Sequence, residues 1–307
     1  MGRVSEIVAG LMARDTVLFS ANRYRLTSID IRGIEMAAEL HGNFVRHKYL
    51  HNRTVKSSKA LFWIVEPDLD VVRRYRSFTP QVFEPINVRL DPTGEFNRIC
   101  RSFDYLLLNT HKTIDWLGPE PEGGWKSWVI PHRHCNFNRY WLPEDRLSKP
   151  KVVGYVGEPE HLHDSEQIKS AVEKLGLHFV SYPSRNLKAY EEFDIGVAWT
   201  RREALRDQTR SNVKMTNLVA HGIPSVVCDY ESYRDVDRSL GGGSCLIRGE
   251  LSEFIDGIAE LVSNEELRRN CKRQSAAALD MYSRAAIAPQ YWRLIEEMRA
   301  DFEARRL

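Results

Sequence analysis

Residues 212–228, Asn-Val-Lys-Met-Thr-Asn-Leu-Val-Ala-His-Gly-Ile-Pro-Ser-Val-Val-Cys, predict a short amphipathic helix followed by a buried strand. The helix is expected to end at Gly222, because glycine readily adopts the left-handed conformation found at helix C-termini. Pro224 prevents the helix from continuing, and the apolar residues from Ser225 to Cys228 favour a strand. This helix–strand pair is one unit of an alternating pattern that extends in both directions along the chain.

Short apolar runs of the kind found in buried strands recur on both sides of this pair. They alternate with helical patterns, among them Asp30–Leu40. Such alternation predicts parallel sheets with right-handed crossovers, and a restart of the pattern after Lys149-Pro150 predicts two sheets. The predicted strands are Val17–Ser20, Asn43–Val45, Ala60–Val65, Gln81–Val88, Tyr105–Leu108 and Trp128–Ile130 before the restart, and Val152–Val156, His178–Ser181, Ile195–Ala198, Ser225–Cys228 and Cys245–Ile247 after it.

The last part of the chain is predicted to be nearly continuous helix, from Leu251 to Arg306. Breaks are expected near Asn264, near Ser283 and at Pro289. The break at Pro289 is expected because proline lacks a backbone donor and its ring clashes with the preceding turn.

The composition is that of a soluble, core-forming protein of the cytoplasm. Of the 307 residues, 42% are hydrophobic and 28% are charged. No apolar run approaches the roughly 20 residues that span a bilayer, and the N-terminus lacks the apolar core of a signal peptide. Five scattered cysteines without a Cys-x-x-Cys pair fit reduced thiols better than a disulfide framework or a zinc site.

Positive charge gathers at or before the start of the helix in residues 212–228. The cations are Arg201, Arg202, Arg206, Arg210 and Lys214. A helix N-terminus already carries unpaired amides and a positive dipole, so added cations are unfavourable there unless an anion offsets them. We therefore predict a phosphate-binding site, with a solvated helix face as the alternative.

A second element of this site is predicted in the turn Tyr155-Val-Gly-Glu-Pro159. It follows the strand Val152–Val156, and ligands of open parallel sheets bind at the carboxyl ends of strands. Gly157 would let backbone amides approach a ligand closely. The chain has no Gly-x-Gly-x-x-Gly fingerprint and no P-loop, and Gly241-Gly-Gly243 is interpreted as a flexible turn because it precedes a strand.

Four segments carry a family resemblance. Val129-Ile-Pro-His-Arg-His-Cys-Asn-Phe-Asn-Arg-Tyr-Trp-Leu-Pro143 is similar to the interdomain crossing of GT-B glycosyltransferases. Val152-Val-Gly-Tyr-Val-Gly157 resembles the strand and glycine turn that open their nucleotide-sugar domain. Lys214-Met-Thr-Asn-Leu-Val-Ala-His-Gly-Ile-Pro224 is similar to a helix of that domain, and Arg32-Gly33 is like their first βα turn. Together these segments are spread over most of the chain, and they occur in the same order as in the family.

The resemblance implies an α/β protein with two Rossmann-like domains facing each other across a cleft. The N-terminal, acceptor-side domain is expected at residues 1–145 and the nucleotide-sugar-binding domain at residues 151–282. A C-terminal helix, residues 283–307, is expected to pack back on the N-terminal domain.

The resemblance also implies transfer of a hexosyl or related sugar from a nucleotide sugar, most simply a UDP- or GDP-sugar, to an acceptor hydroxyl. Fixed cations and amides must then stabilise the leaving diphosphate. No metal is expected, since GT-B enzymes generally use protein cations. The predicted donor-binding residues are Gly157, Arg202, Arg206, Arg210, Lys214, Thr216 and Asn217.

The sequence departs from the family where retaining members usually carry a Glu-x7-Glu pair. The matching positions hold Thr209 and Asn217. Asn217 can hydrogen-bond a ribose hydroxyl, whereas Thr209 supplies no carboxylate. The stereochemistry of transfer is therefore open between inversion and retention.

The acceptor hydroxyl needs a base, and the predicted catalytic candidates are Asp30 and Glu66. Asp30 lies in the first βα turn, and Glu66 follows the strand Ala60–Val65. The alternatives are that Asp30 caps a helix and that Glu66 only turns the chain. His132 and His134 lie at the interdomain crossing, and two histidines without nearby partners do not predict a metal site.

The partner of the N-terminal domain is open between several classes. Residues 1–150 carry an excess of five positive charges, much of it between Arg23 and Lys59, while residues 151–307 carry an excess of three negative charges. The first interpretation of this stretch is a solvated basic face, and the alternative is that it meets an anionic partner, such as an anionic acceptor. The first hypothesis is a carbohydrate or lipid-linked acceptor and a cytoplasmic enzyme, with a peripheral membrane location as an option. The others are glycosylation of modified DNA bases, as in phage enzymes, and a non-catalytic nucleotide-sugar-binding module.

Overall fold

The computed structural model describes residues 16–21, 30–65, 67–85, 95–117, 125–184, 186–201 and 210–306. The chain forms two compact units, which are described separately. Unit 1 comprises Met1–Pro131, Gln208–Arg210 and Ile287–Leu307, and unit 2 comprises His132–Asp207 and Ser211–Ala286.

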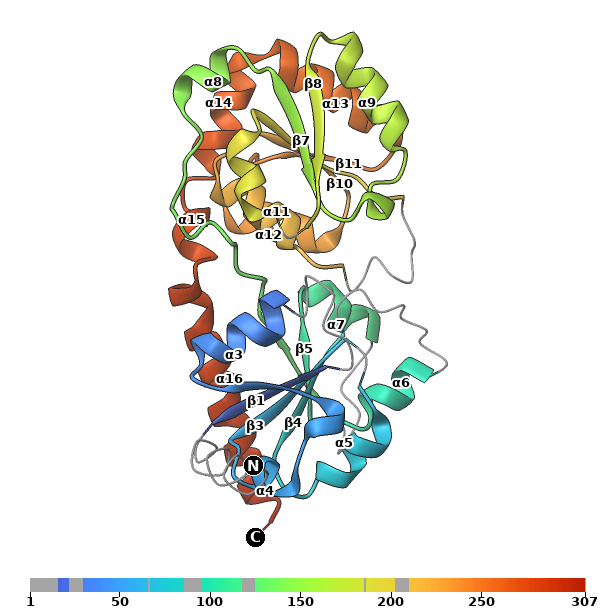
Figure 1. Cartoon of the computed structure of the whole chain (residues 1–307), viewed down its shortest axis with the longest axis vertical. Coiled ribbons are helices and arrows are strands. Elements are labelled where there is room, and N and C mark those ends of the chain that lie inside the picture. The colour runs from blue at the N-terminus through green and yellow to red at the C-terminus, as the bar shows by residue number, and fades with distance from the viewer. Residues whose placement is uncertain are drawn as a thin grey trace, which may run out of the picture. The chain divides into compact units, whose positions relative to one another are not determined.

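Unit 1 contains a six-stranded sheet whose paired strands are all parallel. The strand order is β2-β1-β3-β4-β5-β6, so the chain places β2 on one side of β1 and then returns to build the sheet on the other side (Figure 1). The strands are β1 (Val17–Ala21), β2 (Asn43–Arg46), β3 (Ala60–Ile64), β4 (Gln81–Glu84), β5 (Tyr105–Leu108) and β6 (Lys126–Val129).

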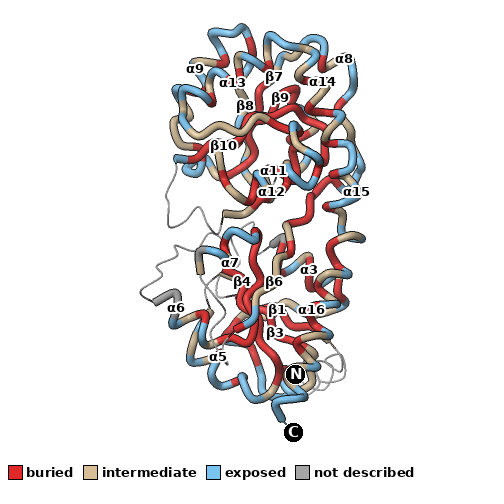
Figure 2. The backbone as a smooth tube through the Cα atoms, turned by 180° about the vertical axis from the view of Figure 1, so that it is seen from behind, coloured by how far each residue is buried: buried red, intermediate tan, exposed pale blue. Residues whose placement is uncertain are grey.

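Helices cover both faces of this sheet because alternate side chains of each strand point to opposite sides. In β1, Phe19 points to one apolar cluster and Leu18 to the other. The Phe19 cluster is covered by α3 (Glu35–Glu39) and α16 (Arg284–Ala304). The other cluster includes residues of α4 (Asn52–Lys56), α5 (Leu69–Tyr75), α6 (Glu95–Cys100) and α7 (His111–Leu117). The four inner strands, β1, β3, β4 and β5, are buried along their whole length, whereas the edge strands β2 and β6 are only partly buried (Figure 2).

The prediction that a C-terminal helix returns to the first domain is confirmed by α16. Ile287, Tyr291, Leu294 and Met298 are buried in the same apolar cluster as Phe19. The predicted helix break at Pro289 is wrong, since α16 runs through it. The packing of this apolar stripe on the sheet outweighs the single hydrogen bond that proline removes.

A buried ion pair joins several elements of unit 1 at the carboxyl edge of its sheet. Arg32, in η1 (Asp30–Ile34), is 1% exposed and pairs with Glu84 at the end of β4. The guanidinium also donates to the Tyr291 hydroxyl at 2.8 Å, to Asn109 Oδ1 at 3.1 Å and to the Ile130 carbonyl at 2.7 Å. Burial raises the pKa of Glu84 to about 7, and Arg32 opposes that rise. Arg32 thereby links η1, three strand ends and α16.

Unit 2 contains a five-stranded parallel sheet of order β11-β10-β9-β7-β8. The strands are β7 (Val152–Val156), β8 (His178–Tyr182), β9 (Ile195–Ala198), β10 (Ser225–Cys228) and β11 (Leu246–Arg248). The helices are α8 (Glu144–Ser148), α9 (Ser165–Lys174), α11 (Val213–Ala220), α12 (Glu231–Ser239), α13 (Leu251–Ser263), α14 (Glu265–Gln274) and α15 (Ala278–Met281). Short 3-10 turns, η3 (Pro159–His161) and η4 (Leu187–Glu192), complete it.

The predicted strands of unit 2 agree closely with the observed ones. The bounds of β7, β9 and β10 are as predicted, because each is a short apolar run buried on both faces. In unit 1, β6 begins at Lys126 rather than at Trp128, and β4 ends at Glu84, while residues 86–88 of the predicted strand lie outside the described residues. The three glycines at 241–243 all have positive φ angles, which agrees with the interpretation as a turn.

Gly154 in β7 provides a test of the packing in unit 2. A Cβ atom at this position would lie 2.0 Å from the buried ring of Phe193. Gly154→Ala is therefore expected to lower the free energy of unfolding by about 1–3 kcal/mol, the usual cost of overpacking a core. Urea unfolding measures the change, and Gly249→Ala, where a Cβ atom meets nothing closer than 3.9 Å, is the matched control. Equal stability of the two variants would contradict the packing described here.

Candidate functional site

The strand order of unit 2 defines where a ligand is expected. The chain passes from β7 to β8 on one side and then returns to β9, which lies on the other side of β7. In open α/β sheets, ligands bind outside the carboxyl ends of the two strands at which the order reverses. Residues 157–159, called the Gly157 turn below, follow β7, and residues 199–201 follow β9. The glycine turn and the start of the cation-rich segment that were predicted to form the phosphate site therefore both come after strands at this reversal point.

Lys214 lies in the first turn of α11, and its ammonium group contacts the residue that precedes the Gly157 turn. Lys214 Nζ donates a hydrogen bond to Tyr155 Oη at 2.6 Å and lies 4.4 Å from the centre of the Tyr155 ring. Lys214 is half-buried, and Tyr155 is fully buried. The charge of Lys214 is therefore fixed beside the carboxyl end of β7.

The start of α11 is held by Ser211 and by residues 132–136. Asn212 precedes the helix, but its Oδ1 accepts a hydrogen bond from the His132 amide at 3.0 Å, and its side chain makes no cap bond within the described part of the chain. Ser211 Oγ instead accepts from the first amide of the helix, that of Val213, at 3.2 Å, and it lies 2.5 Å from His132 Nδ1. These contacts fix the N-terminal end of α11, the positive end of its dipole, against residues 132–136.

The side chains of Thr216 and Asn217 are buried and already engaged. Thr216 Oγ1 donates within α11, to the Val213 carbonyl at 3.0 Å. Asn217 Oδ1 accepts from the Cys135 amide at 2.7 Å, and its Nδ2 donates to the Val213 carbonyl at 2.9 Å. These contacts support a role in holding α11 against residues 132–136, and the predicted ribose contact of Asn217 gains no support from them.

The predicted cations fall into three groups. Arg201 is paired within the protein, because its guanidinium lies 2.6 Å from Asp164 and holds the pKa of that carboxylate below its usual value. Arg202 and Arg206 lie outside the described residues. Arg210 is described and half-buried, close in sequence to the start of α11. Lys214 is thus the predicted donor-binding cation whose position the structure defines most fully.

In unit 1 the corresponding reversal point lies between β1 and β3, and the two catalytic candidates come after these strands in the sequence. Asp30 begins η1, but its side chain is not described, and Glu66 lies outside the described residues. Val65, which directly follows β3, has a φ angle of +72°. Such a conformation is strained for a β-branched residue, and strained backbone gathers at functional sites. This supports the choice of the β3 end without identifying the base.

No group of three metal-ligating side chains is found among the described residues. His134 uses both ring nitrogens within the protein, on the Asn136 amide and the Leu279 carbonyl. The sequence also contains two Asp-x-Asp spacings. In one, Asp68 caps α5; in the other, Asp237 accepts hydrogen bonds from the backbone of the 241–244 turn.

His221, which ends α11, gives a pH-dependent test of this part of unit 2. It is 2% exposed, its Nδ1 donates to the Asn217 carbonyl at 2.7 Å, and burial lowers its pKa from 6.5 to about 4. The folded-state pKa of His221 lies below the unfolded value. The stability that depends on a neutral His221 is therefore complete above pH 6.5 and is lost as the pH falls towards 4. The loss is up to about 3 kcal/mol at pH 4.

His221→Gln is therefore expected to flatten the pH dependence of stability between pH 6.5 and 4. Urea unfolding of both proteins at several pH values in this range measures the effect. Parallel pH profiles for wild type and variant would contradict the assignment.

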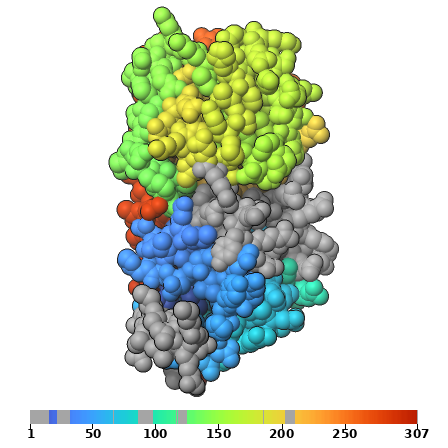
Figure 3. All heavy atoms as spheres, in the orientation of Figure 1, coloured from blue at the N-terminus to red at the C-terminus, as the bar shows by residue number. Residues whose placement is uncertain are grey.

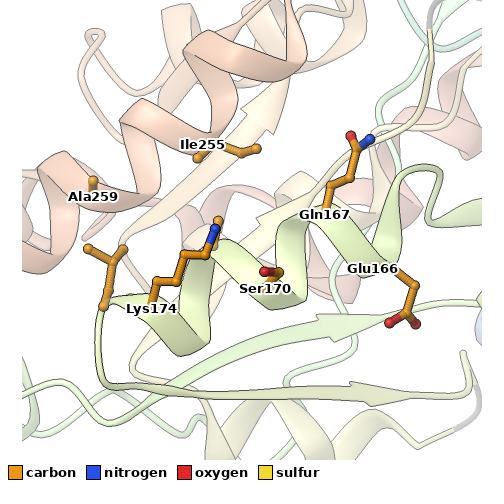
Figure 4. A pocket seen from close by; sticks show the side chains of 8 residues that line it. Glu166, Gln167, Ser170, Lys174, Ile255 and Ala259 are labelled. Carbon is orange, nitrogen blue, oxygen red and sulfur yellow. The ribbon is translucent and has the colours of Figure 1, made fainter.

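A separate surface pocket lies between α9 and α13 of unit 2 (Figure 4). It has a volume of about 580 Å³ and is lined by residues of these helices and the turn that follows α9, including Gln167, Ser170, Lys174, Ile255 and Ala259. None of the loops that follow β7 or β9 contributes to it. It is therefore distinct from the candidate phosphate site.

No protein-family model matches the chain, and no curated protein sequence matches it. Within the described residues, no helix is long and apolar enough to cross a membrane.

Solved structures do resemble this one over nearly its whole length. Sucrose-phosphate synthase from Thermosynechococcus elongatus has a TM-score of 0.60 at 11% sequence identity, covering 94% of this chain and 100% of that one. HepE of Anabaena, in complex with UDP and glucose, has a TM-score of 0.63 at 11% identity, covering 92% and 100%. WaaG, a glycosyltransferase involved in lipopolysaccharide biosynthesis, has a TM-score of 0.56 at 11% identity, covering 91% and 99%.

Two parallel α/β units, each with a strand-order reversal, place the protein among two-domain Rossmann-like folds. The similarity to these structures defines the fold more narrowly. The chain has the GT-B fold, as the resemblance in its sequence indicated.

Proposed function

We propose that this protein is a glycosyltransferase that moves a sugar from a nucleotide-sugar donor to an acceptor hydroxyl. The observation that carries the proposal is the position of Lys214, fixed by Tyr155 beside the Gly157 turn at the reversal point of the unit 2 sheet. The GT-B fold supports it, since similar structures include HepE with bound UDP-glucose.

In the proposed reaction, the acceptor oxygen forms a bond to the anomeric carbon while the bond from that carbon to the diphosphate breaks. Negative charge then grows on the leaving nucleoside diphosphate. Lys214, together with Arg210, Arg202 and Arg206, would stabilise this charge, and the α11 dipole and the amides of the Gly157 turn would add to it. In this proposal, protein cations supply the electrostatic stabilisation in place of a metal ion.

The acceptor proton must pass to a base, and we propose Asp30 and Glu66 of unit 1 for this role. Both belong to segments that follow strands at the sheet reversal point. Asp30→Asn and Glu66→Gln each keep the shape of the side chain. The variant that loses turnover while its affinity for the nucleotide is unchanged identifies the base.

For the acceptor, the surface of unit 1 favours an anionic molecule. Residues 42–65 contain no aspartate or glutamate, and Lys48, Arg53 and Lys56 are exposed. The surrounding segment forms part of the face of unit 1 coloured blue in Figure 3. Binding of an anionic acceptor would weaken as the salt concentration rises, because exposed charges are screened.

The first experiment is a thermal-shift titration against UDP-, GDP-, ADP-, dTDP- and CMP-sugars. A ligand that binds the folded protein raises its melting temperature by mass action. We expect a shift with one nucleotide class, together with slow release of the free sugar when water replaces the acceptor. A protein that responds to none of these donors would overturn the proposal, and one that binds a donor but transfers to no acceptor or water would be a binding module.

A further inference from the structure

We propose that Tyr155 is a positioning residue for the donor diphosphate, and that it joins Lys214 and the Gly157 turn into one preorganised anion-binding unit. This inference rests on the proposed function, because it assigns a role within the donor site. Tyr155 itself touches no substrate; it acts through Lys214 and the turn.

The contacts of the phenol oxygen carry the inference. Tyr155 Oη accepts a hydrogen bond from Lys214 Nζ at 2.6 Å, and its hydroxyl proton is directed to the Glu158 carbonyl at 3.4 Å. The side chain of Glu158 in turn accepts a hydrogen bond from Ser184, in the segment after β8. A chain of polar contacts therefore runs from the cation of α11 through the phenol to the turn after β7.

The packing of the turn supports the same role. A Cβ atom at Gly157 would lie 2.3 Å from the Tyr155 hydroxyl oxygen and 2.5 Å from the ring carbon that bears it. The turn thus lies directly against the end of the phenol, and only glycine allows this approach. Since Tyr155 is fully buried in β7, the phenol provides a rigid surface from which both the turn and Lys214 take their positions.

The phenol holds Lys214 in two ways. Its oxygen accepts one of the donors of the ammonium group, and its ring face attracts the cation. Without the hydroxyl, the flexible lysine side chain would have to be ordered by the ligand itself, and that ordering reduces affinity.

Tyr155→Phe removes one oxygen atom and keeps the ring. We expect the Kd for UDP, or for whichever nucleoside diphosphate binds the wild type, to rise about 3- to 10-fold, the usual effect of losing one ordinary hydrogen bond. The Kd for the nucleoside without phosphates should stay unchanged. Tyr282→Phe is the matched control, because it removes a buried hydroxyl of the same unit that hydrogen-bonds Ser239 at 2.6 Å.

A double-mutant cycle separates positioning from a general loss of stability. If Tyr155 acts through Lys214, Tyr155→Phe should have no further effect on the Kd once Lys214 is alanine, whereas independent effects would multiply. Calorimetric titration of the four proteins gives the cycle. The chemical reactivity of the Lys214 amine towards acetic anhydride gives a reading without any nucleotide, and it should rise in Tyr155→Phe.

The outcomes distinguish this inference from the proposed function. If Lys214→Ala loses nucleotide binding while Tyr155→Phe binds as the wild type does, the donor site stands and the positioning role is overturned. Multiplying effects, or a loss of nucleoside affinity equal to the loss for the diphosphate, would also overturn it. If the wild type binds no nucleoside diphosphate, both the proposed function and this inference fail.

Discussion

Lys214→Ala is expected to lower the turnover of the proposed sugar transfer by about 100- to 1,000-fold, the usual effect of removing one charged donor from a developing anion. The affinity for the intact nucleotide-sugar donor should fall less, by about 10- to 100-fold, because the donor carries less charge than the transition state at the oxygen that joins the sugar to the diphosphate. The reason is structural: Lys214 is held beside the β7 turn by Tyr155, at the position where a leaving diphosphate would gain charge. Steady-state kinetics with the donor found by thermal shift, together with calorimetry for binding of that donor, measure both effects.

Two further substitutions make the result for Lys214 specific. Lys169→Ala removes an exposed lysine from α9 of the same unit and should leave both constants unchanged. Lys214→Arg keeps the charge but changes its shape, so it should recover binding more fully than turnover. If Lys214→Ala turned over as fast as the wild type, the leaving group would have to be stabilised elsewhere.

Arg32→Ala is expected to lower the stability of unit 1 by about 3–5 kcal/mol, the usual effect of removing one partner from a buried ion pair. Glu84 is fully buried, so the variant leaves a carboxylate without its countercharge. It also breaks the contacts of the guanidinium with Asn109 and Tyr291. Hydrogen exchange of β3 and β4 peptides, measured beside urea unfolding, assigns the loss to unit 1.

The pH dependence of this loss follows from the Glu84 carboxyl. Its folded-state pKa of about 7 lies above the usual value, so ionisation costs stability as the pH rises from about 4.5 through 7. Arg32 limits that cost, and without it the pKa rises further. The destabilisation by Arg32→Ala should therefore be larger at pH 8 than at pH 5, where Glu84 is neutral in the variant.

A double substitution tests whether the charges or the shape matter. Arg32→Met with Glu84→Leu replaces the pair by apolar groups of similar size and should recover most of the lost stability. Equal loss in the single and double variants would show that the neutral contacts of Arg32 dominate.

The sheets were predictable from the sequence because their strands are short apolar runs buried on both faces. β3 and β10 illustrate this, since β3 is wholly apolar and β10 contains one polar residue, Ser225, which is buried. The end of such a run also locates the loops that carry the site, which is why Gly157 and the Lys214 segment were predicted together. α16 was harder, because the effect of Pro289 depends on packing against a sheet encoded far away in the chain.

The pairing of side chains within the site could not be predicted from the sequence. Arg201 is one of the five cations that predict the phosphate site, but it pairs with Asp164, which lies in the crossover between β7 and β8. Nothing in either segment of the sequence indicates that contact. Tyr155 was missed as well. It stands in an apolar strand where an aromatic residue is ordinary core, and its contact with Lys214 depends on how α11 packs over the strand ends.

The assignment of α16 to unit 1 has a consequence for how the protein is made. The sheet of unit 1 is synthesised early, but the face formed by Phe19, Phe62 and Tyr105 is covered by Ile287 to Met298. All of unit 2 must leave the ribosome first, which takes on the order of ten seconds at ordinary rates of translation. During that interval the nascent sheet presents an uncovered apolar face, so this half of the protein completes its folding last.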